Sequence, residues 1–78
     1  MLLAIDIGNS NIVLGIYQNN EWFEMFRMPT HSKDFLLMHT FLEKYSTQIK
    51  KSVFSSVVPS VNSDVISVLA DYQINLLM

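Results

Sequence analysis

Residues 2–17 read LLAIDIGNSNIVLGIY, two apolar segments on either side of a short polar turn. The first segment is apolar until Asp6, which is typical of a short buried strand. The second, residues 12–17, is rich in β-branched residues and apolar on both faces, as central strands are. Gly8, Asn9 and Ser10 lie between them, and glycine and asparagine are the residues that best tolerate positive φ in a tight turn. The pattern predicts two strands of a sheet with a carboxylate at the end of the first.

A third strand is expected directly after the second. Asn19-Asn20 predicts a two-residue hairpin turn, and Pro29 ends the strand that follows because proline cannot donate to the ladder. Strict alternation from 22 to 28 would place Trp22, Glu24, Phe26 and Met28 on one face and Phe23, Met25 and Arg27 on the other.

Two amphipathic helices are expected around a further strand. Ser32 is the predicted N-cap of the first helix, whose apolar stripe comprises Phe35, Met38, Phe41, Leu42 and Tyr45. Residues 52–58 have strand character and stop at Pro59. The second helix follows from Ser60, with apolar positions at Val61, Val65, Val68, Leu69 and Tyr72. Residues 74–78 predict the start of another strand. The order βββαβα, possibly with a final β, indicates an α/β fold: a mixed sheet with helices on its faces, as in the ribonuclease H-like fold.

Composition excludes several classes of protein. The chain has 78 residues and no cysteine, which excludes disulfides and thiolate zinc sites and suits a reducing compartment. Its formal net charge is -2, so the sequence lacks the excess of basic residues that nucleic-acid binding needs. No apolar run approaches the length of about 18 residues that a membrane span needs. Hydrophobic residues make up 50% of the chain. A short chain with so many apolar residues and no disulfide to stabilise it is expected to be part of a larger protein or an obligate oligomer.

One group of residues has a clear chemical logic, the run from Asp6 to Asn11. A carboxylate ends an apolar strand, and the turn after it can present several backbone N–H groups to one point. Such turns bind phosphate oxygens, and a nearby carboxylate can hold the Mg²⁺ that accompanies nucleotide phosphates. The alternative is a plain β-turn in which Asp6 caps backbone amides and the other residues serve as turn formers.

Other polar and aromatic groups favour structural interpretations. His31 and His39 are separate in sequence and are expected to be surface or satisfied polar groups rather than metal ligands. Lys44, Lys50 and Lys51 are expected to be solvated. The aromatic residues Trp22, Phe23 and Phe26 could stack on a nucleobase, but aromatic residues on strands more often belong to a core or an interface.

Residues 1–15, MLLAIDIGNSNIVLG, closely resemble the opening of type III pantothenate kinases. These enzymes belong to the superfamily of acetate and sugar kinases, Hsp70 and actin. The family's first phosphate motif, Asp-x-Gly-Asn-Thr/Ser, is matched by Asp6, Gly8, Asn9 and Ser10. A second segment, SSVVPSV at residues 55–61, resembles the family's Ser-Val-Val-Pro-Ser segment at a strand–helix junction.

The resemblance implies ATP-dependent phosphorylation of pantothenate to 4'-phosphopantothenate, the first step of coenzyme A biosynthesis. It implies a cytoplasmic homodimer that needs Mg²⁺ and a monovalent cation, K⁺ or NH₄⁺. Asp6 would position Mg²⁺, directly or through water. Gly8, Asn9 and Ser10 would line the ATP phosphates, with Asn11 as a neighbour, and residues 55–60 would face the same cleft.

Three elements of the family are absent from these 78 residues: the Gly-x-Asp-Arg pantothenate motif, a second phosphate motif and a candidate general base. No catalytic residue is therefore assigned. Residues 1–78 are expected to be the N-terminal ATP-binding subdomain of a longer two-domain kinase, inactive without its C-terminal domain. Two alternatives stay open, a transcriptional regulator of the Bvg accessory factor group and another actin- or Hsp70-like ATPase module. Asn9 favours the pantothenate kinase type, since many sugar kinases carry a second glycine there.

Overall fold

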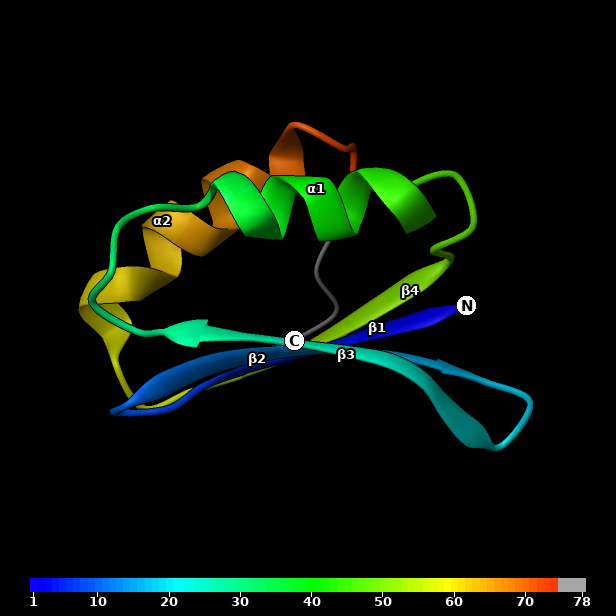
Figure 1. Cartoon of the computed structure of the whole chain (residues 1–78), viewed down its shortest axis with the longest axis horizontal. Coiled ribbons are helices and arrows are strands. Elements are labelled where there is room, and N and C mark those ends of the chain that lie inside the picture. The colour runs from blue at the N-terminus through cyan, green and yellow to red at the C-terminus, as the bar shows by residue number, and fades with distance from the viewer. Residues whose placement is uncertain (75–78) are drawn as a thin grey trace.

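The computed structural model describes residues 1–74, which form one sheet and two helices (Figure 1). The elements are, in order, β1 (Leu2–Ile7), β2 (Asn11–Gln18), β3 (Glu21–Pro29), α1 (Leu36–Tyr45), β4 (Lys51–Ser56) and α2 (Pro59–Ala70). This confirms the predicted order βββαβα. The further strand expected at 74–78 falls, apart from Ile74, outside the described residues.

The sheet is mixed, with strand order β3-β2-β1-β4. β1 and β2 pair antiparallel, as do β2 and β3, whereas β1 and β4 pair parallel. The parallel pair requires a crossover, which α1 supplies. The turn between β2 and β3 is formed as predicted, with Asn19 and Asn20 at φ 56° and 66°.

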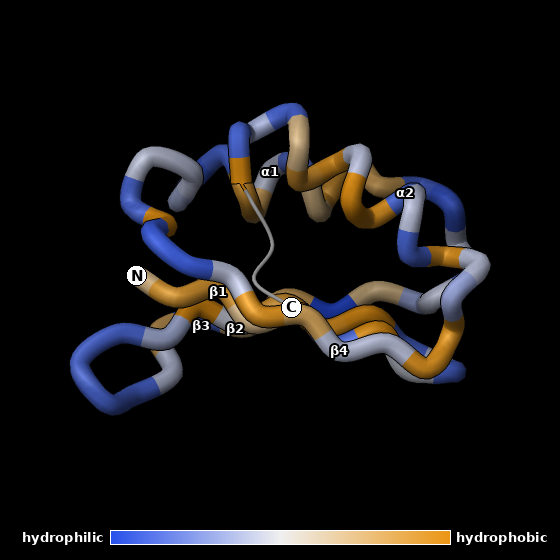
Figure 2. The backbone as a smooth tube through the Cα atoms, turned by 180° about the vertical axis from the view of Figure 1, so that it is seen from behind, coloured by the Kyte–Doolittle hydropathy of each residue, from blue (hydrophilic) through white to orange (hydrophobic). Residues whose placement is uncertain are grey.

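Both helices lie on the same face of the sheet (Figures 1 and 2). The expected α/β layering is confirmed, and within residues 1–74 the helical cover is confined to that face. The core forms between the layers from alternate strand residues and the apolar helix stripes, principally Leu3, Ile5, Ile7, Ile12, Leu14, Ile16, Met38, Leu42, Val65 and Leu69. Within residues 1–74 no helix is long and apolar enough to cross a membrane.

The start of α1 differs from the prediction. The helix begins at Leu36, not after Ser32, because Lys33 adopts a φ of 61° that a helix cannot continue through. The carboxylate of Asp34 instead accepts the N–H of Leu36 at 3.1 Å. α2 begins at Pro59, one residue earlier than expected, and proline suits the first helical turn because its missing N–H would have no helical partner there.

A β-bulge in β3 overturns part of the predicted alternation. Tyr17 lies opposite Trp22 while Ile16 lies opposite Glu24, so Phe23 is an extra residue. Because of it, Trp22 shares the open face of the sheet with Met25, and Phe23 packs edge-on against Tyr45 of α1 with ring centroids 6.2 Å apart. The alternation predicted for residues 24–28 holds.

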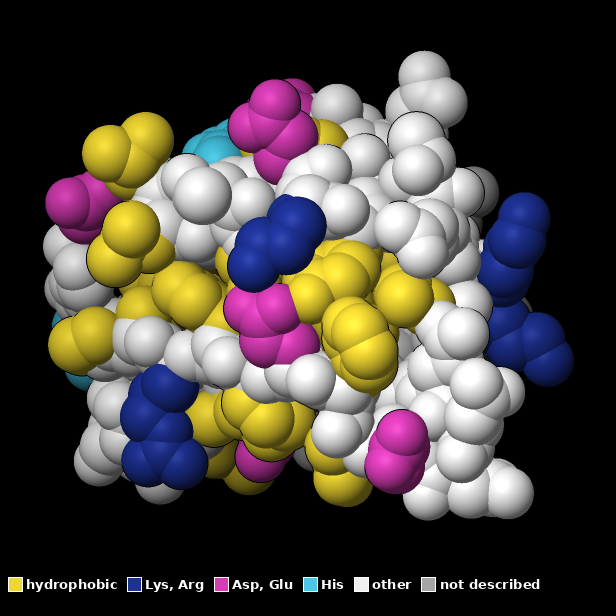
Figure 3. Space-filling model, turned by 45° about the vertical axis from the view of Figure 1, so that its right-hand side comes forward, with side chains coloured by type: hydrophobic (Ala, Val, Ile, Leu, Met, Phe, Trp, Pro, Cys, Tyr) yellow, Lys and Arg dark blue, Asp and Glu magenta, His cyan; other side chains and the backbone are white. Residues whose placement is uncertain are grey.

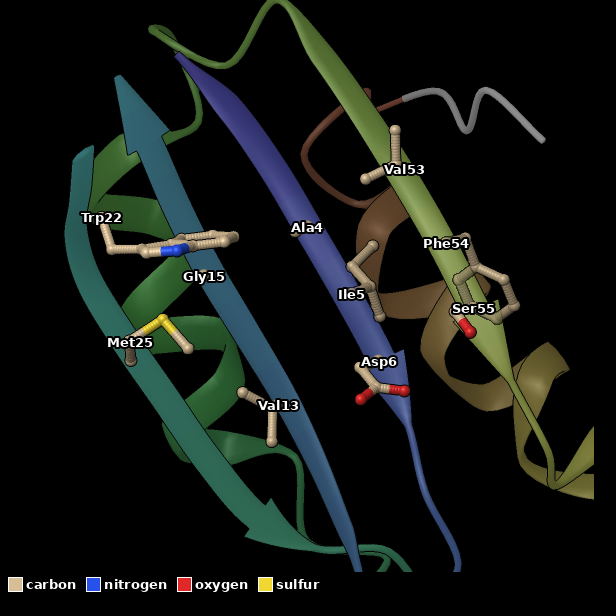
Figure 4. Close-up of a pocket in the computed structure, with 10 residues that line it drawn as sticks. All are labelled: Ala4, Ile5, Asp6, Val13, Gly15, Trp22, Met25, Val53, Phe54 and Ser55. Atoms are coloured by element: carbon tan, nitrogen blue, oxygen red, sulfur yellow. The ribbon is translucent and has the colours of Figure 1, made fainter. Parts of the chain in front are cut away.

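The face of the sheet opposite the helices is apolar and open. The Trp22 side chain lies over Gly15 beside Met25 (Figure 4), and both side chains are 55% exposed. Ala4, Val13 and Val53 continue this open apolar face, which surrounds a hollow of about 370 Å³. Hydrophobic side chains also gather on the surface seen in Figure 3. Part of the high apolar content of the sequence therefore lies on the exposed surface of the molecule.

Candidate functional site

Asp6 stands at the carboxyl end of β1 with an exposed side chain. Its neighbours in register are Val13 on β2 and Ser55 on β4. Figure 4 shows the Asp6 carboxylate and the Ser55 hydroxyl on the open side of the sheet. Among the described residues, no hydrogen bond or ion pair joins Asp6 to a partner. The alternative in which Asp6 caps the amides of the turn is thus not what residues 1–74 adopt.

The turn after Asp6 is closed by one backbone hydrogen bond. Gly8 donates its N–H to the carbonyl oxygen of Asn11 at 2.8 Å, while the side chains of Asn9 and Ser10 are exposed. The positive φ expected in this turn is wrong, because no residue from 8 to 11 adopts it. A side chain at position 8 would be crowded, since its Cβ would lie 3.3 Å from the Asn11 carbonyl oxygen, closer than an ordinary contact.

Thr30, which no sequence pattern marks as a site residue, holds this turn in place. Its side chain is 2% exposed. Its hydroxyl donates to the Gly8 carbonyl oxygen at 2.6 Å, and its N–H donates to the Ser10 carbonyl oxygen at 3.0 Å. The hairpin turn at Asn19-Asn20 indicates only that the end of β3 returns to the start of β2. The bulge at Phe23 shifts the register by one residue and so decides that Thr30 lies opposite Ser10.

The SSVVPS segment lies beside the same turn. β1 and β4 are parallel neighbours, so their carboxyl ends meet at one edge of the sheet. Val57 extends their ladder by donating its N–H to the Ile7 carbonyl oxygen at 3.0 Å. The Ser56 hydroxyl accepts the Val58 N–H at 3.1 Å and donates to Asn62 Oδ1 at 2.6 Å. These contacts fix the chain as it passes from β4 into α2, and they bring the two motifs together as expected.

The residues at this edge fit Mg²⁺ carried by a nucleotide better than a metal held by protein alone. Within residues 1–74 no three His, Cys, Asp or Glu side chains come together as a metal cage. Mg²⁺ keeps several waters and is usually bound through one or two carboxylates together with substrate phosphates. Asp6 offers one exposed carboxylate at this edge, two residues before the turn from Gly8 to Asn11.

The two histidines have different surroundings: His31 follows directly on Thr30, whose N–H bonds the Ser10 carbonyl of the turn, and His39 lies on α1. His31 is exposed, and His39 is satisfied, with Nδ1 2.9 Å from the Tyr72 hydroxyl, which itself donates to the His39 carbonyl oxygen at 3.0 Å. Because that hydroxyl is donating elsewhere, Nδ1 of His39 must carry the proton of their shared bond. Burial raises the pKa of the Tyr72 hydroxyl. The structural interpretation of both histidines is confirmed.

Lys44 is exposed, as expected, and it also forms an ion pair. Its ammonium group lies 3.1 Å from a carboxylate oxygen of Glu24, which also accepts a hydrogen bond from the Tyr45 hydroxyl. The hydrogen bond from Tyr45, assisted by Lys44, lowers the pKa of Glu24. The same bond raises the pKa of Tyr45. This cluster ties α1 to β3, so its role is structural.

Comparisons with known proteins find one family that matches most of the chain. The family model for type III pantothenate kinases matches residues 2–78.

Three curated relatives bear the name type III pantothenate kinase. The one from Desulforapulum autotrophicum is 38% identical over 71 residues, which cover 81% of this chain and 27% of the relative. The relative from Bifidobacterium animalis subsp. lactis is 36% identical over 86% of this chain and 30% of its own length. The relative from Shouchella clausii is 39% identical over 78% of this chain and 27% of its own length. The chain thus spans less than a third of each of these relatives.

Proposed function

The chain belongs to the type III pantothenate kinase family, and we propose that its protein uses ATP to phosphorylate pantothenate to 4'-phosphopantothenate, the first step of coenzyme A biosynthesis. The observation that carries this proposal is the meeting of two motifs at one sheet edge. The turn from Gly8 to Asn11 and the segment at 55–60 lie 44 or more residues apart in sequence, yet parallel pairing of β1 with β4 places them side by side.

In this proposal the backbone and short side chains of Gly8, Asn9 and Ser10 line the ATP phosphates, with Asn11 beside them. Asp6 positions Mg²⁺, directly or through water. Bound Mg²⁺ would neutralise charge on the phosphate oxygens. Phosphoryl transfer depends mainly on positioning and on stabilising that charge, and the exposure of Asp6, Asn9 and Ser10 leaves them accessible to a ligand. A monovalent cation, K⁺ or NH₄⁺, belongs to the same proposal, with no residue assigned to it.

We further propose that residues 1–78 form the N-terminal ATP-binding subdomain of a longer two-domain kinase. Two observations support it. The chain spans about 27–30% of its relatives, and the open face of the sheet exposes Trp22, Met25 and Val53 around a hollow that further chain could fill. The general base and the pantothenate-binding groups would then lie outside these residues. The cytoplasmic homodimer implied by the family resemblance is part of this proposal.

The test is an assay of the full-length protein with ATP, Mg²⁺ and pantothenate. Mass spectrometry should detect 4'-phosphopantothenate, and ADP release should depend on pantothenate. Residues 1–78 alone, run as the control, should form no product. ATP hydrolysis independent of pantothenate would instead support an ATPase module, and ATP binding without turnover would support a regulatory relative; either result contradicts the kinase proposal.

A further inference from the structure

Thr30 is a buried polar residue with an unusual pair of contacts. It follows directly on Pro29, the last residue of β3, and is 2% exposed. Its two donors reach two different carbonyl oxygens of one turn, those of Gly8 and Ser10. These carbonyls flank Asn9, the central residue of the phosphate motif. Thr30 therefore constrains both peptide groups on either side of the turn's exposed tip.

The direction of these bonds fixes the direction of the N–H groups that follow. In a trans peptide, the C=O of one residue and the N–H of the next point in opposite directions, and the described chain contains no cis peptide bond. With the Gly8 carbonyl held toward Thr30, the N–H group of Asn9 is aimed to the side away from Thr30, whereas the N–H of Asn11 faces Gly8 across the turn, on the same side as the Asn11 carbonyl that accepts the Gly8 N–H. A backbone donor directed as that of Asn9 is what a phosphate-binding turn needs.

We propose that Thr30 is a positioning residue for the ATP phosphates, acting through the turn from Gly8 to Asn11. This inference rests on the proposed function, since it assumes that the turn receives a nucleotide. The hydroxyl is the decisive group, because the Thr30 N–H bond would persist with any residue other than proline. Without the hydroxyl, the Gly8–Asn9 peptide loses its only described side-chain tether and is free to rotate its N–H away from the ligand.

The test uses the full-length protein with three variants. Thr30→Val keeps the shape and removes the hydroxyl, whereas Thr30→Ser keeps the hydroxyl. Thr40→Val is the matched control, because the Thr40 hydroxyl is exposed and bonds only the Leu36 carbonyl of its own helix. Calorimetry with Mg-ATP should show affinity about tenfold weaker in Thr30→Val, equivalent to about 1.4 kcal/mol. Thr30→Ser should stay within about twofold of wild type, and Thr40→Val should match it. KM for pantothenate should be unchanged in all three.

Several outcomes decide the proposal. A Thr30→Val protein that melts earlier but binds Mg-ATP like wild type would make Thr30 merely structural and overturn it. If wild type binds Mg-ATP without phosphorylating pantothenate, the proposed function fails, and Thr30 is still judged by the affinities. If wild type binds no Mg-ATP, both proposals fail. If Thr30→Val does not fold, an NMR titration of wild type with Mg-ATP replaces it: a shift of the Asn9 amide supports the proposal, and an unmoved Asn9 amide overturns it.

Discussion

Asp6 and Ser55 lie opposite each other in the parallel register of β1 and β4, and both side chains are exposed on the open side of the sheet (Figure 4). This pairing joins the start of the run from Asp6 to Asn11 to the start of the SSVVPS segment at residues 55–60. A carboxylate and a hydroxyl are thus presented together at the edge where the strands end. Ligands of open α/β sheets bind beyond the carboxyl ends of the strands, which is where this pair stands.

Replacing Asp6 with asparagine tests the carboxylate. In the full-length protein, Asp6→Asn should lower kcat for pantothenate phosphorylation by about two orders of magnitude, because loss of a metal-positioning charge removes transition-state stabilisation. Steady-state kinetics measures the change. Asp71→Asn is the matched control, since Asp71 is exposed and follows the last residue of α2, a helix of 12 residues that begins at the motif edge, and it therefore lies about 18 Å along the helix from that edge. Near-normal turnover of a folded Asp6→Asn protein would sink the assignment.

Gly8 should matter more for nucleotide binding than for folding. The Cβ of a side chain at position 8 would lie 3.3 Å from the Asn11 carbonyl oxygen. A small shift of the turn relieves this close contact but changes the conformation of the turn. Gly8→Val should therefore weaken Mg-ATP binding by about tenfold or more, while the free energy of unfolding falls by about 1 kcal/mol. Calorimetry and chemical denaturation measure the two effects.

Gly15→Ala provides the contrast for Gly8→Val. A Cβ at Gly15 would lie 2.6 Å from a Trp22 ring carbon, so the ring must move, but this clash lies in the middle of β2 and not at the turn. The variant should lose stability and keep its affinity for Mg-ATP. Equal losses of affinity in both variants would mean that Gly8 acts only through general stability.

The bond from Tyr45 to Glu24 should make stability depend on pH in the acid range. Because the bond lowers the pKa of Glu24 in the folded protein, its contribution is fully present above the pKa of an unfolded glutamate, about 4.3, and is lost as the pH falls through the lower folded value. Tyr45→Phe should thus lower Tm near pH 7, and this loss of Tm should shrink as the pH falls into the acid range. Thermal melts across this range measure it.

Tyr17→Phe is the control for that experiment, because the Tyr17 hydroxyl bonds no residue in the part of the chain that the structure describes. Its Tm should follow wild type at every pH. If the Tm of Tyr45→Phe stays below that of wild type by the same amount from pH 7 to pH 3, ionised Glu24 makes no contribution to stability through this bond.

Local pattern predicted most of the fold, and contacts between distant residues account for what it missed. The βββαβα order followed from apolar periodicity and from prolines at element ends. The bulge at Phe23 could not be predicted, because one inserted residue leaves an apolar run that still alternates on either side of it. The face assigned to Trp22 was consequently wrong.

The sequence selects the candidate motif residues but not the residue that supports the turn. Asp6 and the residues from Gly8 to Asn11 form a contiguous run with phosphate-binding character, so sequence alone selects them. Thr30 is 22 residues from Gly8 in sequence. A single threonine after a proline does not indicate which residue its hydroxyl will bond. Only the register of β2 with β3 brings them together.

Residues 1–78 alone should associate and not catalyse. Trp22 and Met25 are each 55% exposed on an open sheet face, and apolar patches of this kind drive association in water. Analytical ultracentrifugation at about 50 μM, within the μM–mM range in which exposed apolar surface promotes association, should show species larger than a monomer. The double variant Trp22→Lys and Met25→Glu should shift the distribution toward monomer.

Leu37→Glu is the control and should leave association unchanged. Leu37 is exposed on α1, in the layer on the other side of the sheet. A monomeric 1–78 fragment that phosphorylates pantothenate would contradict both the open-face argument and the need for further chain.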